Sequence, residues 1–114
     1  MPPKSNPLRL NPLQLKTLAL LQELAKSQAT SSRNAETGEV LITNLPYPHG
    51  DHFHVGARIV ASRDASGLNN PSVWLALARK GLLKGDFPLA VLLTKEGQAY
   101  DTGMADAMFL GGHA

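Results

Sequence analysis

The sequence predicts a single α+β domain, in which a small three-stranded antiparallel sheet packs on three or more helices. Two segments, residues 11–28 and 70–82, carry apolar residues at helical spacing. Residues 88–93 form a short aliphatic run of the length of a buried strand, and residues 39–45 and 53–62 are rich in β-branched and aliphatic residues. Helices and strands are therefore both expected, without the regular alternation of a parallel α/β fold.

Length and composition restrict the class of protein. The chain has 114 residues, of which 43% are hydrophobic and 18% charged, and this is enough for one domain with a modest core. The absence of cysteine excludes disulfides and thiolate zinc sites. No apolar stretch reaches the length of a membrane span or, before Asn11, of a signal peptide, so a cytoplasmic location is expected. Residues 1–10 contain three prolines and are predicted to be a flexible N-terminal arm, with residues 11–114 as the domain.

The central helix is predicted over residues 70–82. Asn69 and Asn70 can accept hydrogen bonds from the first N–H groups of a helix, and Pro71 suits the first helical position. Gly81 and Gly85 supply positions at which the helix can stop. The apolar positions on one face are Val73, Trp74, Leu77, Ala78 and Gly81.

The first helix is predicted to begin at Asn11 and Pro12 and to end near Gln28. Its apolar stripe consists of Leu13, Leu18, Leu20, Leu21, Leu24 and Ala25. Residues 29–38 are polar and rich in Ser, Thr, Asn and Gly, which is typical of a long mobile loop.

Residues 39–62 are predicted to form a β-hairpin whose connection is residues 46–51. The second half is ambiguous, because residues 57–65 also fit helical spacing. A strand to about residue 58 followed by a short helix is favoured. Beyond the strand at 88–93, Thr94 can cap a C-terminal helix, although Gly97 weakens it.

Two short motifs resemble those of winged helix-turn-helix domains of the MarR-like bacterial regulators. These are ARKGLL (residues 78–83) and LTKEG (residues 93–97), and Gly67, Leu68 and Val73 are similar to the turn and anchor of a helix-turn-helix. The resemblance implies a winged-helix-like domain with residues 70–82 as the recognition helix. It also implies a possible homodimer through a terminal helix bearing Met104, Met108, Phe109 and Leu110. Two departures are Arg63, where a small residue is expected, and a very short wing between Leu83 and Pro88.

The winged-helix resemblance implies a binding module that contacts DNA or a protein partner through the central helix and the hairpin. A net charge of +2 and a pI near 9.2 are compatible with either partner. For DNA, polar side chains would read base edges while cations contact phosphates. The residues predicted to bind are Asn69, Asn70, Ser72, Arg63, Arg79, Lys80 and Lys84.

Three of the four histidines and one carboxylate lie within six residues, and this set is suited to a transition metal. The candidate ligands are His49, Asp51, His52 and His54. In an extended segment, His52 and His54 share one face. The alternative function is therefore a metal-binding protein or a small metal-dependent hydrolase. Against it, a hairpin loop with solvent-exposed histidines explains the same residues, and no other catalytic motif is present, so an enzyme is the less favoured interpretation.

Overall fold

The computed structural model confirms the α+β class. It describes residues 6–28, 30–43, 48–49, 52–55, 58–61, 65–86, 90–104 and 109–110. The helices in this part of the chain are α1 (Pro12–Leu24), the 3-10 helix η2 (Ser66–Asn69), α2 (Pro71–Arg79) and α3 (Lys95–Ala99). The strands are β1 (Ser31–Arg33), β2 (Val40–Ile42), β3 (Pro48–His49), β4 (His52–Val55), β5 (Arg58–Ala61), β6 (Leu83–Asp86), β7 (Ala90–Leu93) and β8 (Phe109–Leu110).

Both long helices begin at the Asn-Pro pairs, as predicted. Asn11 and Gln14 form a reciprocal capping box: the Gln14 N–H donates to Asn11 Oδ1 at 2.8 Å, and the Asn11 N–H donates to Gln14 Oε1 at 3.0 Å. The Asn70 side chain accepts from the Ser72 N–H at 3.0 Å. Gly81, with φ of 76°, follows the end of α2, where the Leu82 N–H bonds to the Leu77 carbonyl.

The first sheet has four strands, so the prediction of a three-stranded sheet was wrong. All neighbours are antiparallel, in the order β1-β2-β7-β6. Val40 of β2 and Leu83 of β6 both lie opposite Leu93 of the central strand β7. The additional strand β1 lies in the segment expected to be a long loop, and β6 lies where almost no wing was expected. Both are short strands that depend on pairing rather than on an apolar pattern of their own.

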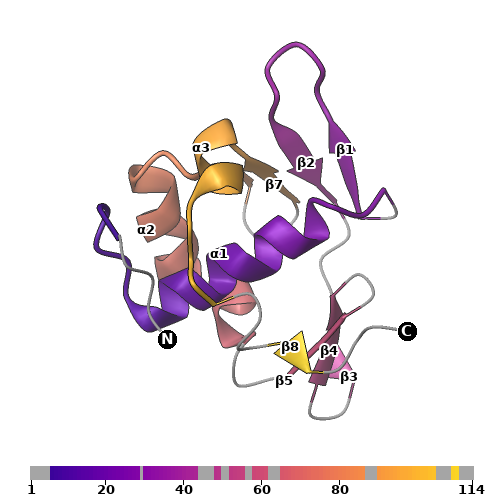
Figure 1. The fold of residues 1–114 in the computed structure, drawn as a ribbon, viewed down its shortest axis with the longest axis vertical. Coiled ribbons are helices and arrows are strands. Elements are labelled where there is room, and N and C mark those ends of the chain that lie inside the picture. Colours follow the sequence, from indigo (N-terminus) through magenta and orange to yellow (C-terminus); the bar gives the residue numbers. More distant parts are fainter. Residues whose placement is uncertain are drawn as a thin grey trace.

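The second sheet is also antiparallel, with the order β3-β4-β5-β8. Residues 58–61 belong to strand β5, so the favoured expectation of a helix after residue 58 was wrong there. The turn before α2 is instead the short η2. In Figure 1, the first sheet lies above α1 and the second sheet below it.

The core lies around α1, which is buried over most of its length and contacts η2, α2, α3 and β4. The buried residues of α2, β2 and β7 belong to the same hydrophobic cluster as those of α1. The largest fully buried side chains are Leu18, Leu20, Leu21, Leu24, Val40, Ile42, Val60, Leu77, Leu82, Val91 and Leu93. Trp74 is buried as predicted, and its Nε1–H donates to the Leu68 carbonyl at 3.0 Å. Ala78, expected on the buried face, is exposed.

The C-terminal helix is shorter than expected, because α3 ends at Ala99 and residues 109–110 form strand β8. The Thr94 hydroxyl accepts from the Gly97 N–H at 3.0 Å and donates to the Leu82 carbonyl at the same distance. Met108, which was assigned to a longer helix, lies outside the described residues, and Met104 lies beyond the end of α3.

Residues 6–10, assigned from the sequence to the N-terminal arm, contact the folded domain. Leu10 is buried, and the Asn6 amide donates to its carbonyl at 2.9 Å. The Tyr100 hydroxyl donates to Asn6 Oδ1, and the Lys80 amine donates to the Leu8 carbonyl. This segment therefore connects the start of α1 to both α2 and α3. None of the helices in the described part of the chain is long and apolar enough to cross a bilayer.

Candidate functional site

The polar residues predicted to contact DNA or a protein partner lie at the start of α2, but they do not form one contact surface. Asn70 is engaged in capping the helix through its side-chain oxygen. Asn69 ends η2 with its side chain exposed, and Ser72 is exposed on the first turn of α2. Arg63 lies outside the described residues. Among the described residues, the front of the helix therefore presents two small polar side chains and no cation.

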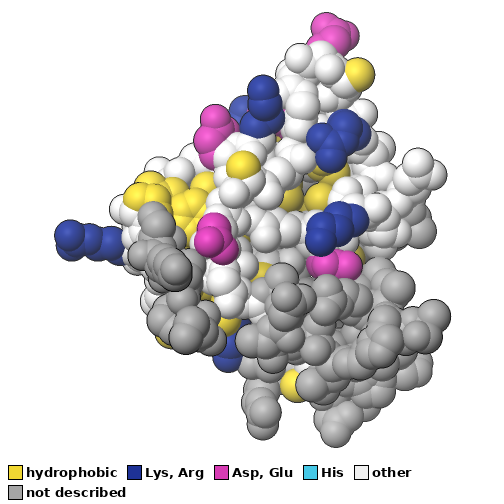
Figure 2. Space-filling model, viewed as in Figure 1, with side chains coloured by type: hydrophobic (Ala, Val, Ile, Leu, Met, Phe, Trp, Pro, Cys, Tyr) yellow, Lys and Arg dark blue, Asp and Glu magenta, His cyan; other side chains and the backbone are white. Residues whose placement is uncertain are grey.

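The predicted cations lie at the far end of α2 and on β6. The Lys80 amine donates to the Leu8 carbonyl, and Lys84 pairs with Glu39 at 3.0 Å. Arg79 is exposed in the last turn of α2, where the helix dipole favours a positive charge. On the face shown in Figure 2, the described Lys and Arg side chains are dispersed among Asp and Glu and do not form a continuous basic patch.

A shallow apolar groove between α2 and β6 is the site that sequence reasoning missed. Its volume is about 330 Å³, and its lining residues are Pro71, Trp74, Leu75, Ala78, Leu83 and Gly85. Trp74 and Leu83 are nearly buried, whereas Leu75 is 52% exposed. Leu75 and Leu41 are the large hydrophobic side chains exposed in the described part of the chain. A single exposed leucine is ordinary on a protein surface, but Leu75 lines an apolar groove and so extends the apolar surface of that groove.

Two local features form this groove. Pro71, Leu75 and Ala78 are spaced i, i+4 and i+7, so they lie along one side of α2. Strand β6 runs beside that side, and Gly85 has no side chain to fill the space. The available signal was the position of Leu75, which falls off the buried stripe of Trp74 and Leu77. The groove also needs β6 as its second wall, so Leu75 by itself does not predict a groove from the sequence.

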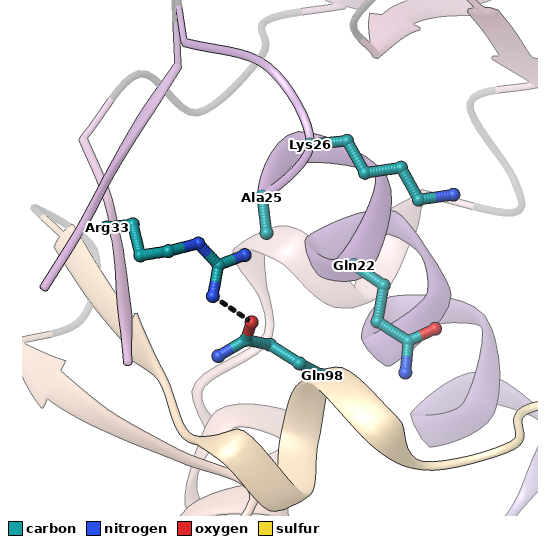
Figure 3. Close-up of a pocket in the computed structure, with 5 residues that line it drawn as sticks. All are labelled: Gln22, Ala25, Lys26, Arg33 and Gln98. Carbon is teal, nitrogen blue, oxygen red and sulfur yellow. Dashed lines mark hydrogen bonds between the residues drawn. The ribbon is translucent and has the colours of Figure 1, made fainter. Parts of the chain in front are cut away.

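A second, polar pocket lies between the end of α1, strand β1 and helix α3, with a volume of about 330 Å³ (Figure 3). The Arg33 guanidinium donates to Gln98 Oε1 at 3.1 Å. The Gln98 amide donates to the Gly38 carbonyl at 2.8 Å, and the Gln22 amide donates to the Gly97 and Tyr100 carbonyls at 2.9 and 2.8 Å. These donors already have partners within the chain.

This polar network is therefore best explained as a clasp that holds β1, α1 and α3 together. Lys26 extends away from Arg33 in Figure 3 and pairs with Glu23 at 3.4 Å, so the two cations do not converge on one ligand. The pocket contains no nucleophile and no acid–base pair. It provides no chemistry on which a reaction could be based.

The predicted metal ligands lie on and beside strands β3 and β4. His49 ends β3 and His52 begins β4, and their Cα atoms are direct partners across the two strands. His54 follows two residues later on β4. Asp51 lies outside the described residues. Among the side chains that the structure describes, which do not include these histidines, no group of three His, Cys, Asp or Glu could hold a metal ion.

Comparisons of the chain with protein-family models, with curated proteins and with solved structures gave no match.

Proposed function

We propose that this chain is a winged-helix-like binding module that holds a protein partner in the groove between α2 and β6. The partner is an acidic segment that presents one large apolar side chain. The observation that carries the proposal is Leu75, which is 52% exposed beside an apolar groove on the helix that would otherwise contact DNA. Covering this side chain would contribute roughly 1 kcal/mol, and the anchor of the partner would add its own burial.

The order of the elements supports the winged-helix-like part of the proposal. Helix α2 leads directly into β6, and β6 pairs with β7, as a recognition helix leads into a two-stranded wing. Strand β7 then pairs with β2, which precedes both helices η2 and α2 in the chain. In this comparison, α2 is the recognition helix and its exposed side is the contact surface.

The composition of that exposed side favours protein over DNA. A groove-reading helix needs polar and cationic side chains on the turns that enter the groove. The exposed positions on the first two turns of α2 are instead Pro71, Ser72, Leu75 and Ala78. A leucine offers no hydrogen bond and no charge to a phosphate group. A leucine beside an apolar groove can instead pack against an apolar side chain of a protein partner.

The charge around the groove favours an acidic partner. Residues 69–85 include Arg79, Lys80 and Lys84 but no Asp or Glu. Lys84 is paired with Glu39 at 3.0 Å, so Arg79 and Lys80 carry the positive charge that favours an acidic partner. A second copy of this chain would bring Arg79 and Lys80 near the same two cations of its neighbour, and this repulsion disfavours self-association through the groove. An acidic segment gains from the same charges, as in helix-in-groove recognition by an apolar anchor with charged flanks.

A peptide-display selection on the whole chain would test the proposal. Leu75→Ser removes the exposed anchor surface, and Leu41→Ser is the matched control, since Leu41 is 38% exposed on β2. We expect the selected peptides to share a large apolar residue flanked by Asp or Glu. Leu75→Ser should weaken their binding by about tenfold or more, equivalent to roughly 1.4 kcal/mol, and Leu41→Ser should leave it unchanged.

Two results of these experiments would contradict the proposal. Enrichment of no peptide, or equal enrichment on the Leu75→Ser variant, would contradict a protein-binding groove. A generic DNA duplex titrated at low and then moderate salt provides the DNA arm. Binding that weakens steeply with salt, depends on Arg79 and Lys80 and is unaffected by Leu75→Ser would instead assign α2 to phosphate contacts.

A further inference from the structure

We infer that strands β3 and β4 carry a three-histidine site for a transition metal ion, formed by His49, His52 and His54 and suited to Zn²⁺. This site is separate from the groove between α2 and β6, and its existence does not depend on the proposed partner. The inference rests on the register of the second sheet and on the chemistry of imidazole ligands.

The register brings the three histidine positions together. The Cα atoms of His49 and His52 are paired directly across β3 and β4, and direct cross-strand partners occupy the same face of a sheet. His54 is two residues further along β4, and positions i and i+2 of a strand also share a face. All three positions therefore belong to one face of the second sheet. A register shifted by one residue would have separated them.

The histidine face is the face of the second sheet opposite to its core face. Phe53 lies between His52 and His54 and pairs with Val60, which is fully buried in the core. The register therefore places position 53 on the same face of the sheet as Val60. The histidine positions alternate with Phe53, so they belong to the other face. On that face, His52 lies opposite Ala61 and His54 lies opposite Ile59.

The spacing of these positions is that of a compact ligand set. Cβ atoms of direct cross-strand partners are about 4.5–5.5 Å apart, and positions i and i+2 are about 7 Å apart. An imidazole extends a nitrogen well beyond its Cβ, and a zinc ion needs each nitrogen at about 2.0–2.1 Å. The backbone register thus places the three positions within the span that one ion bridges. Three protein ligands leave a fourth tetrahedral position for water or another group.

Ligand chemistry selects the class of metal. Imidazole suits Zn²⁺, Cu²⁺ and Ni²⁺, whereas Mg²⁺ and Ca²⁺ prefer oxygen ligands. The chain contains no cysteine, so no thiolate competes for a soft metal ion elsewhere. The fourth histidine, His113, is far away in the sequence and provides a natural control.

Isothermal titration calorimetry of the whole, chelator-treated chain with Zn²⁺ would test the inference. We expect one equivalent to bind and Mg²⁺ not to compete. Each of His49→Ala, His52→Ala and His54→Ala should weaken the affinity for Zn²⁺ by at least roughly tenfold. Replacing a residue that only hydrogen-bonds to a metal ligand already weakens metal binding by about this factor. His113→Ala should leave the affinity unchanged. At equal Zn²⁺ concentration, the melting temperature should also rise less in each of the three variants than in the wild type.

Circular dichroism of each metal-free variant would verify its fold. Where an alanine variant unfolds, the corresponding Gln variant would be titrated in its place. The inference is overturned if no stoichiometric Zn²⁺ binds. It is also overturned if His49→Ala binds as tightly as the wild type, because the ion would then be held by β4 alone. A loss in His113→Ala equal to that in the other variants would likewise assign the ion to a different site.

Discussion

Replacing Gly97 by alanine should destabilise the protein, although the same change in an ordinary helix is favourable. An alanine in a helix gains roughly 0.5–1 kcal/mol over glycine. In this structure, a Cβ at residue 97 would lie 2.0 Å from the Leu82 carbonyl oxygen and 2.7 Å from Leu93 Cδ1. The nearest neighbour is backbone and would have to move by about 1 Å to reach a contact distance that real Cβ atoms show.

The size of the effect follows from the bonds made by that carbonyl. The Leu82 oxygen accepts from the Thr94 N–H at 3.2 Å, and it shares the single hydrogen of the Thr94 hydroxyl, at 3.0 Å, with the Gly81 carbonyl at 2.8 Å. Loss of both bonds to the Leu82 oxygen would cost about 1 kcal/mol each, and overpacking adds roughly 1–3 kcal/mol. After the gain in helix propensity is subtracted, Gly97→Ala should lower the free energy of unfolding by roughly 2–4 kcal/mol.

Urea unfolding followed by the fluorescence of Trp74, the single tryptophan of the chain, would measure this effect. Gly81→Ala is the matched control, because Gly81 has φ of +76° but nothing within 4 Å of the added Cβ. Its cost should be only the left-handed backbone strain, roughly 1–2 kcal/mol. Equal costs at the two glycines would contradict the close contact, and a stabilised Gly97→Ala variant would refute the reasoning entirely.

Three further predictions concern packing and capping. Gly67→Ala should cost roughly 1–3 kcal/mol, because its Cβ would lie 1.9 Å from Thr17 Oγ1; in a double-mutant cycle Thr17→Ala should recover part of this cost, and strictly additive costs would argue against the contact. Trp74→Phe should cost roughly 1–3 kcal/mol in thermal unfolding by circular dichroism, since the buried Leu68 carbonyl loses its donor at 3.0 Å; an unchanged melting temperature would contradict this. Asn11→Ala should cost about 1 kcal/mol through loss of the capping box, whereas Asn11→Asp should retain most of the stability, as chemical unfolding of both variants would show.

The helix starts were predictable because their signals are local. Asn11 and Gln14 satisfy each other's backbone within four residues, and Asn70 does the same for Ser72. The interpretation of Gly97 from the sequence was incomplete. From the sequence, this glycine only weakens a helix, but in the folded chain it allows α3 to approach the Leu82 carbonyl. That requirement arises from tertiary contact and has no local signature.

The short strands were not predictable for the same reason. Strand β1 contains only Ser31, Ser32 and Arg33, and a polar sequence of this kind normally indicates a loop. It is extended because it pairs with β2. Next to the paired residues, the Thr43 N–H also donates to the Thr30 carbonyl at 3.0 Å. Strand β6 depends on β7 in the same way. Since the groove needs β6 as its second wall, the sequence could not locate it, whereas the histidine cluster was visible from spacing alone.

The pairing of β2 with β7 has a consequence for how the chain is made. Val40 lies opposite Leu93, so during synthesis β2 emerges long before its neighbour in the first sheet exists. Its buried residues Val40 and Ile42 would meanwhile be exposed to other nascent chains. The hairpin with β1 is available at once and covers one edge of β2, and the clasp by Gln98 can close only after α3 has left the ribosome. The short hairpin thus gives the backbone of β2 one partner strand before β7 is synthesised, while its apolar side chains are buried only when the first sheet and the core are complete.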